Sequence, residues 1–154
     1  LFVRTPESAF TLANFCRMHL LSALSTLRIG LDILRREENV RVERICAHGG
    51  FFKTPGVGQR ILAAAVGAPV SVMETAGEGG PYGMALLCAY MLWRRKGESL
   101  EEYLDNRVFA DAGVSTVLPD SVDAAGFTSF LERYKAAFPL ERLAVETLKM
   151  EKNT

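Results

Sequence analysis

The fold is decided by the stretch VERICAHGGFFKTPGVGQRILAAAVGAPVSVMETAGEGGPYGMALLCAYMLW, which runs from Val42 to Trp93. A short apolar strand at residues 45–47 ends at the glycine pair Gly49-Gly50. The chain then turns and enters a helix whose first turn can carry Pro55, because a proline at that position gives up no helical hydrogen bond. The helix is expected to end at Gly67, which suits a left-handed cap and is followed by a proline that cannot continue the helix.

The second half of this stretch repeats the same order of elements. Residues 70–73 alternate in polarity and are β-branched, which predicts a second strand. A glycine-rich turn at residues 77–83 then opens a strongly apolar helix at residues 84–93. Strand, glycine turn and helix, twice over, form an α/β crossover unit. Its ligand site is expected where the strands end and the helices begin.

Helices dominate the prediction on either side of this unit. The predicted elements are a long amphipathic helix from Pro6-Glu7-Ser8 to Glu37, a short helix from Ser99 to about Leu104, a β-like segment at residues 115–118, a helix from Asp120 or Ser121 to Phe138 that Pro139 ends, and a final helix at residues 140–150. Neither an internal repeat nor a low-complexity linker interrupts the sequence. We therefore expect a single domain over residues 1–154.

The composition excludes several classes of function. The 154 residues are 49% hydrophobic, and 18 basic residues balance 18 acidic ones, so no basic excess favours nucleic acid or a membrane surface as a partner. The longest apolar runs, residues 61–73 and 84–93, are too short to span a bilayer. Three widely spaced cysteines in apolar contexts (Cys16, Cys46 and Cys88) predict buried thiols in a reducing compartment, the cytoplasm, rather than disulfides or a zinc site.

The glycine pair is the sharpest local feature. Two glycines after a strand let a ligand approach the backbone closely, and the following helix start favours a negative group. The alternative is that the turn simply needs one left-handed residue. Lys53, one turn further on, could contact a phosphate or ribose, or be solvated.

The other candidate motifs lack residues that a specific binding or catalytic site would need. Gly56-Val57-Gly58 lacks the third glycine of a dinucleotide fingerprint. Glu78 is either a ligand contact or an acid placed to suit a helix start. His48 and His19 have no partner at the spacing of a catalytic triad or metal site. We therefore assign no catalytic residue and no metal ligand.

Several separated motifs, in this order and spacing, resemble the C-terminal, ATP-binding domain of the FGGY carbohydrate kinases, most closely the xylulose and ribulose kinases. The motifs are Ala47-His48-Gly49-Gly50-Phe51-Phe52-Lys53-Thr54, Gln59, Gly67-Ala68-Pro69-Val70, Glu74, Glu78 and Gly83-Met84-Ala85. The sequence departs from the family pattern at Ala63-Ala64, where Ala-Asp is common, and at residues 79–82, which replace a more helical run.

The resemblance implies part of an actin-like, ribonuclease H-like ATPase domain that is helix-rich with a small, incomplete sheet. Gly49, Gly50 and Phe51 would line the adenine and ribose of ATP. Thr54 would contact the nucleotide, and Lys53 belongs to the same predicted site. Gln59 would be a structural or near-site residue. In the family, the catalytic base, the sugar-binding residues and the phosphate-gripping hairpin precede this region, so the Mg²⁺ ligands are not expected in this chain.

The resemblance thus implies the C-terminal part of an ATP-dependent kinase acting on a sugar hydroxyl, with a ketopentose such as xylulose or ribulose as substrate. Residue 1 is Leu, and we expect a fragment of a longer chain that is inactive alone. The alternative is a stand-alone α/β binding or interaction module without catalytic activity. A fragment would expose sheet edges and apolar surface, which predicts a homo-oligomer.

Overall fold

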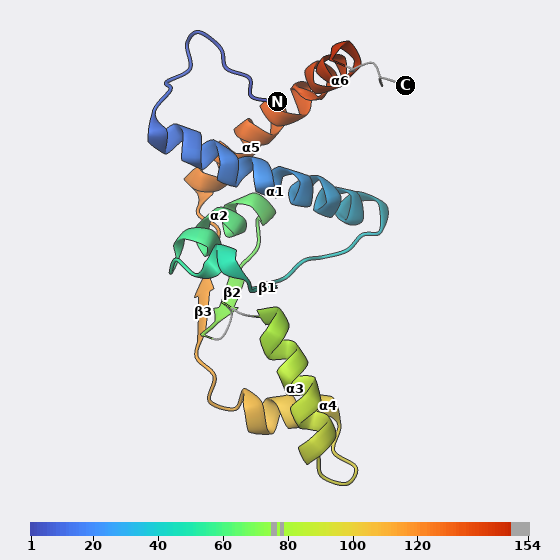
Figure 1. The fold of residues 1–154 in the computed structure, drawn as a ribbon. Coiled ribbons are helices and arrows are strands. Elements are labelled where there is room, and N and C mark those ends of the chain that lie inside the picture. The colour runs from blue at the N-terminus through green and yellow to red at the C-terminus, as the bar shows by residue number, and fades with distance from the viewer. Residues whose placement is uncertain (75–76, 78, 149–154) are drawn as a thin grey trace. The chain divides into compact units, whose positions relative to one another are not determined.

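The computed structural model describes residues 1–74, 77 and 79–148 (Figure 1). Two compact units divide the chain: Leu1–Val40 with Ser121–Thr154, and Arg41–Asp120. Among the described residues, the first unit holds three helices, and the second holds the sheet and the first glycine turn. The single domain expected over residues 1–154 stays a prediction.

A three-stranded sheet organises the unit Arg41–Asp120. Strand β1 (Ile45–Ala47) pairs in parallel with β2 (Val70–Met73), and β2 pairs antiparallel with β3 (Val114–Val117). The parallel pairing of the first two strands, which a crossover unit requires, is confirmed. The β-like segment predicted at residues 115–118 is a true strand shifted by one residue. A helix-rich α/β fold with a small sheet is likewise confirmed.

Helix α2 (Val57–Val66) carries the core of this unit. Its buried side chains include Leu62, Ala63, Ala65 and Val66, and Val70 of the adjacent strand is also buried. The helix ends at Gly67, whose φ of 66° and ψ of 32° are left-handed, as the sequence predicted.

The predicted start of α2 was wrong. Pro55 does not lie in the first turn of the helix, because a short 3₁₀ helix, η1 (Gly50–Phe52), and a left-handed Gly56 come before Val57. The chain needs these residues to turn from β1 before it can enter the helix.

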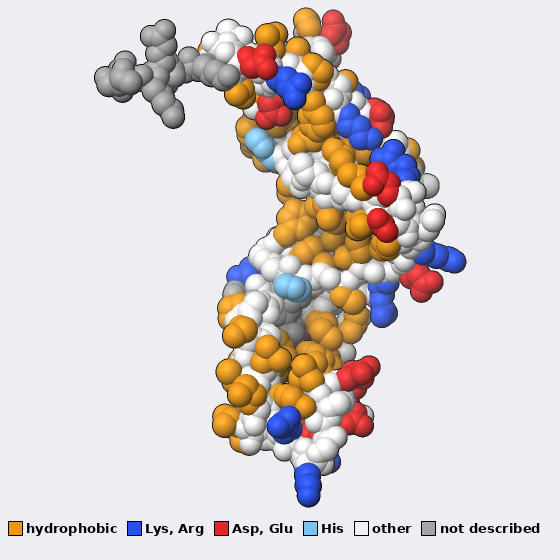
Figure 2. All heavy atoms as spheres, turned by 90° about the vertical axis from the view of Figure 1, so that its right-hand side faces the viewer, with side chains coloured by type: hydrophobic (Ala, Val, Ile, Leu, Met, Phe, Trp, Pro, Cys, Tyr) orange, Lys and Arg blue, Asp and Glu red, His pale blue; other side chains and the backbone are white. Residues whose placement is uncertain are grey.

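Helix α3 (Gly79–Trp93) starts five residues before the predicted Met84. Pro81 falls in its first turn, where proline is tolerated, so the glycines that indicated a turn form the beginning of the helix. No residue of α3 is buried, although the helix contains no charged residue. Figure 2 shows apolar side chains over much of the surface where Figure 1 places α3 and α4.

The segment after α3 contains two short helices. Helix α4 (Leu100–Tyr103) begins with the predicted cap, because the Ser99 hydroxyl accepts from the Glu102 amide and the Glu102 carboxylate accepts from the Ser99 amide. A π-helical turn, η3 (Leu104–Val108), follows directly.

The other unit contains α1 (Leu12–Glu37), α5 (Ser121–Ala136) and α6 (Phe138–Thr147). Helix α1 starts at Leu12, after a Thr11 cap that accepts from the Asn14 amide, and not at the predicted Pro6-Glu7-Ser8. Pro139 lies at the start of α6 rather than after the end of α5, a position that suits its fixed φ. Residues 149 and 150, in the predicted final helix, lie outside the described residues.

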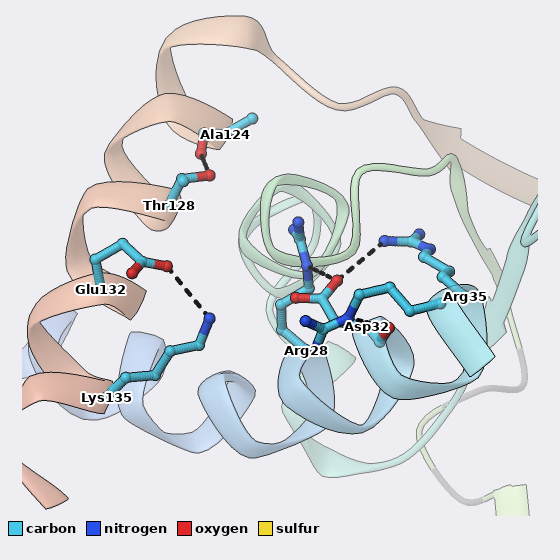
Figure 3. Close-up of polar contacts among 8 residues, drawn as sticks. Arg28, Asp32, Arg35, Ala124, Thr128, Glu132 and Lys135 are labelled. Atoms are coloured by element: carbon cyan, nitrogen blue, oxygen red, sulfur yellow. Dashed lines mark hydrogen bonds and ion pairs between the residues drawn. The ribbon is translucent and has the colours of Figure 1, made fainter.

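Ion pairs within single helices line α1 and α5 (Figure 3). Arg28 Nε lies 2.7 Å from Asp32 Oδ1, Arg35 lies 3.8 Å from the same oxygen, and Lys135 Nζ lies 3.2 Å from Glu132 Oε1. Ion pairs between residues three or four positions apart on one helix contribute only about 0.2–0.5 kcal/mol each, so these pairs add little to the stability of the fold.

The cysteine prediction was wrong in one respect. Cys16, Cys46 and Cys88 are free thiols, but all three are exposed rather than buried. Cys46 is the middle residue of the three-residue strand β1 and points away from the side on which its two neighbours are half-buried, and Cys88 lies on the uncovered helix α3. Within the described part of the chain, no helix has the length and apolar character needed to cross a membrane.

Candidate functional site

The candidate site lies where β1 and β2 end. Because the two strands are parallel and paired from Ile45↔Val70 to Ala47↔Val72, their carboxyl ends meet at one edge of the sheet. The chain leaves β1 through His48-Gly49-Gly50 and leaves β2 through Glu74 and the second glycine-rich segment. Ligands of α/β folds bind at this kind of edge.

The glycine pair leaves a stretch of bare backbone. Gly49 has φ 107° and ψ 176°, a conformation that side chains rarely adopt, and Gly50 starts η1. Apart from the adjacent residues in the chain, no heavy atom lies within 4 Å of a Cβ built on either glycine, so no side chain from elsewhere in the described chain packs over this backbone. Gly50 is exposed. A flat ligand could therefore reach this backbone without displacing a described side chain from any other part of the chain.

Phe51 is fixed by the start of α2. A Cβ on Gly58 would lie 2.6 Å from the Phe51 carbonyl oxygen and 2.9 Å from its ring, so glycine at position 58 is what admits the phenyl group. The Phe51 ring also meets Phe52 edge to face, at 5.2 Å between centroids, and remains 36% exposed. The partly exposed ring of Phe51 therefore lies beside the open glycines.

Lys53 and Thr54 close the turn. The amides of Phe52 and Lys53 donate to the carbonyls of Gly49 and Gly50, which holds η1 in shape. The aliphatic part of Lys53 runs along Gly77, with Cε and Cγ at 3.6 and 3.7 Å from a Cβ built there. Thr54 is exposed. All five predicted site residues, Gly49, Gly50, Phe51, Lys53 and Thr54, therefore lie in one continuous turn, and their role in binding stays a prediction.

His48 has a contact that the sequence did not suggest. A Cβ built on Gly79 would overlap the His48 imidazole, so the ring lies directly against the first residue of α3. The only signal in the sequence was the absence of a side chain at position 79, among several glycines with no such neighbour. His48 and Lys53 together bring the first glycine turn into contact with the second.

Gln59 is structural. Its side chain is 5% exposed, and Nε2 donates to the carbonyl oxygens of Val70 (3.3 Å) and Ser115 (2.9 Å). This amide joins α2 to both β2 and β3. Of the two roles that the sequence left open for Gln59, the geometry favours the structural one.

A pocket of ≈ 240 Å³ opens beside the end of β2. Glu74, Tyr82, Arg107 and the segment Val108–Gly113 line it, and the Glu74 carboxylate lies against Gly113. None of the five predicted residues lines this pocket, and the sequence did not predict it.

Chemically, the turn can bind and orient a ligand. Across the described ranges 1–74, 77 and 79–148, no three His, Cys, Asp or Glu side chains come close enough to hold a metal ion. Glu78, the remaining acidic candidate, lies outside the described residues. The arrangement is therefore one of exposed backbone, an aromatic face and a cationic side chain.

Comparison with known protein families gave a match for this chain. A family model described as the FGGY family of carbohydrate kinases, C-terminal domain, matches residues 1–92. This match covers more than half of the chain and includes α1, the glycine turn, both parallel strands and nearly all of α3. A search of curated proteins and a search of solved structures each gave no match.

Proposed function

Because the chain belongs to the FGGY family of carbohydrate kinases, we propose that it forms the ATP-binding side of a kinase that phosphorylates a sugar hydroxyl. The match is to the C-terminal domain of a family of phosphotransferases, and the helix-rich unit with its small sheet is part of the actin-like ATPase fold. A ketopentose such as xylulose or ribulose is the substrate that we propose, from the motif resemblance alone.

The observation that carries the proposal is the open backbone at Gly49 and Gly50. A nucleoside is flat, and stacking it against a strand-to-helix turn requires that no Cβ projects into its plane. Both positions meet this requirement, at the carboxyl edge of a parallel strand pair. Phe51 supplies apolar surface at the same turn.

Each site residue has a distinct proposed role. Gly49, Gly50 and Phe51 line the adenine and ribose of ATP or ADP, and Thr54 offers a hydroxyl to the nucleotide. Lys53 belongs to the same turn, and its ammonium group is proposed to interact with a ribose or phosphate oxygen. Phosphoryl transfer depends on positioning and on Mg²⁺ that offsets phosphate charge. We assign neither a Mg²⁺ ligand nor a catalytic base to this chain, and propose that it is inactive without the part of the kinase that carries them.

The same proposal covers location and assembly. We propose that the kinase works in the cytoplasm, a reducing compartment in which free thiols such as those of Cys16, Cys46 and Cys88 persist. The exposed apolar side chains of α3 support self-association into a homo-oligomer, in which they would be removed from water.

The test is a direct measurement of ATP binding by isothermal titration calorimetry, on the longest natural polypeptide that carries this sequence. Gly50→Ala adds one methyl group where the nucleoside would lie. We expect ATP to bind about tenfold more weakly, because a methyl forced into a packed contact costs about 1–3 kcal/mol. Stability should change little, since nothing surrounds that position.

Gly126→Ala is the matched control. Gly126 also has open space around it, but it lies in α5 of the other unit, so ATP affinity should stay the same. A wild-type chain that does not bind ATP, or a Gly50→Ala variant that binds it as tightly as wild type, would contradict the proposal. Binding of a different ligand in place of ATP would favour the stand-alone binding module.

A further inference from the structure

We propose that His48 is a positioning residue that braces the first glycine turn against the start of α3 and so keeps the backbone of Gly49 and Gly50 open. This inference rests on the proposed function, because the opening matters only if a nucleotide occupies it. It gives a role to His48, which belongs to the motif at residues 47–54 but was assigned no function in it.

The first observation is the contact itself. Three atoms of His48 (Nδ1, Cγ and Cβ) lie closer than 3.0 Å to the position that a Cβ on Gly79 would take. No real Cβ tolerates such neighbours, so position 79 admits only glycine while His48 holds this place. Since Cβ and Cγ are among the three atoms, a change in the outer part of the ring alone does not relieve the contact.

The second observation is that the His48 imidazole does not cover the backbone of Gly50. His48 directly precedes the glycine pair, so its ring could have folded over Gly49 or Gly50. Instead, no atom of His48 lies within 4 Å of a Cβ built on Gly50. The ring that could occlude the opening is held to one side, against Gly79.

A second brace acts at the other end of the turn. The stem of Lys53 lies along Gly77, which belongs to the same glycine-rich segment as Gly79. The turn is therefore held at both ends, by His48 before the glycine pair and by Lys53 after η1. Within the described part of the chain, His48 makes no hydrogen bond, so its brace acts by packing of the ring.

A brace of this kind affects binding more than chemistry. It fixes the backbone that contacts the nucleoside, and that contact is the same in the ground state and in the transition state. Loss of the brace should therefore raise Kd and KM for ATP and leave kcat nearly unchanged. A general loss of folding would instead lower the unfolding temperature of the unliganded protein.

The experiment is a double-mutant cycle of His48→Ala and Gly79→Ala, read by ATP affinity and by the unfolding temperature without ligand. We expect each single variant to bind ATP about fivefold more weakly, which is about 1 kcal/mol at about 1.4 kcal/mol per tenfold change. The losses should be less than additive in the double variant, because His48→Ala removes Nδ1 and Cγ from the space of the added methyl and leaves only the position 48 Cβ, at 2.9 Å, to be relieved by a small shift. His48→Phe, which keeps a flat ring, should bind ATP as wild type does. His19→Ala, at the other histidine, serves as the control.

The outcomes separate the two proposals. If the wild-type protein binds no ATP, the proposed function fails and the brace has no role. If ATP binds and His48→Ala leaves its affinity unchanged, the brace alone is refuted. Strictly additive losses in the cycle, or an equal loss in His48→Phe, would also refute it, since both show that the ring does not act through its contact with Gly79.

Discussion

Gln59→Met tests the bridge that joins α2 to the sheet. Methionine keeps the length of the side chain and suits a buried site, but it removes the amide that donates to the carbonyl oxygens of Val70 and Ser115. A hydrogen bond contributes about 1 kcal/mol net, and a buried acceptor left without a donor costs about 1–3 kcal/mol. The contact to Val70 is buried and the one to Ser115 only partly so, which gives a total loss of about 2–3 kcal/mol.

Thermal unfolding followed by circular dichroism measures this loss. For a chain of this size, 1 kcal/mol corresponds to about 2–4 °C, so the midpoint should fall by about 4–12 °C. Val57→Met is the matched control, because Val57 lies on the same helix but is 47% exposed and makes no such bridge. Its midpoint should stay within about 2 °C of wild type, as is usual for surface substitutions.

The reasoning fails if Gln59→Met unfolds at the same temperature as Val57→Met. The two strand carbonyls would then have found water or another donor, and α2 would be held to the sheet by its apolar side chains alone. A urea titration gives a second reading: a lower midpoint with an unchanged slope indicates lost stability without a change in the surface exposed on unfolding.

Two further predictions concern conformation and assembly. Gly67→Ala should destabilise the chain by about 1–2 kcal/mol, because φ at this position is 66°. Gly30→Ala should instead stabilise it by about 0.5–1 kcal/mol, because Gly30 lies within α1 and has open space around it. Thermal melts in which both substitutions shift the midpoint in the same direction would contradict this assignment. Met91 is 76% exposed on the uncharged helix α3 and should contribute to self-association. Met91→Glu should therefore lower the mass measured by light scattering at high protein concentration. A wild-type protein that is monomeric in this measurement would refute the predicted oligomer.

The sequence correctly predicted those parts of the fold that depend on residues close together in the chain. The left-handed end of α2 at Gly67 follows from one residue, and the strand at residues 70–73 follows from its alternation. The parallel pairing of β1 with β2 follows from the short crossover between them. The start of α1 was missed because a proline and an acid also suit a turn, and that is what residues 5–8 form.

Tertiary contacts decided what the sequence could not show. The pairing of β2 with β3 joins residues about 45 positions apart, and nothing in the local pattern of residues 114–117 says which strand they join. The exposure of Cys88 could not be read from its apolar context, because burial depends on what packs against α3. In the site, the glycine turn was visible from spacing, but the contacts of His48 and Lys53 with the second glycine segment exist only once both strands are paired.

The two adjacent glycines of the site occur for different physical reasons, and only Gly50 is evidence that a ligand binds there. Gly49 has φ 107°, a backbone conformation that disfavours any side chain whether or not a ligand binds. Gly50 begins η1 without a positive φ, is exposed, and has empty space where a Cβ would project. The turn itself therefore accounts for Gly49 but not for Gly50, where alanine would fit the backbone and cost less entropy. A flat ligand lying on that backbone supplies the missing reason, which is why the Gly50→Ala substitution, rather than Gly49→Ala, separates a binding turn from a purely structural one.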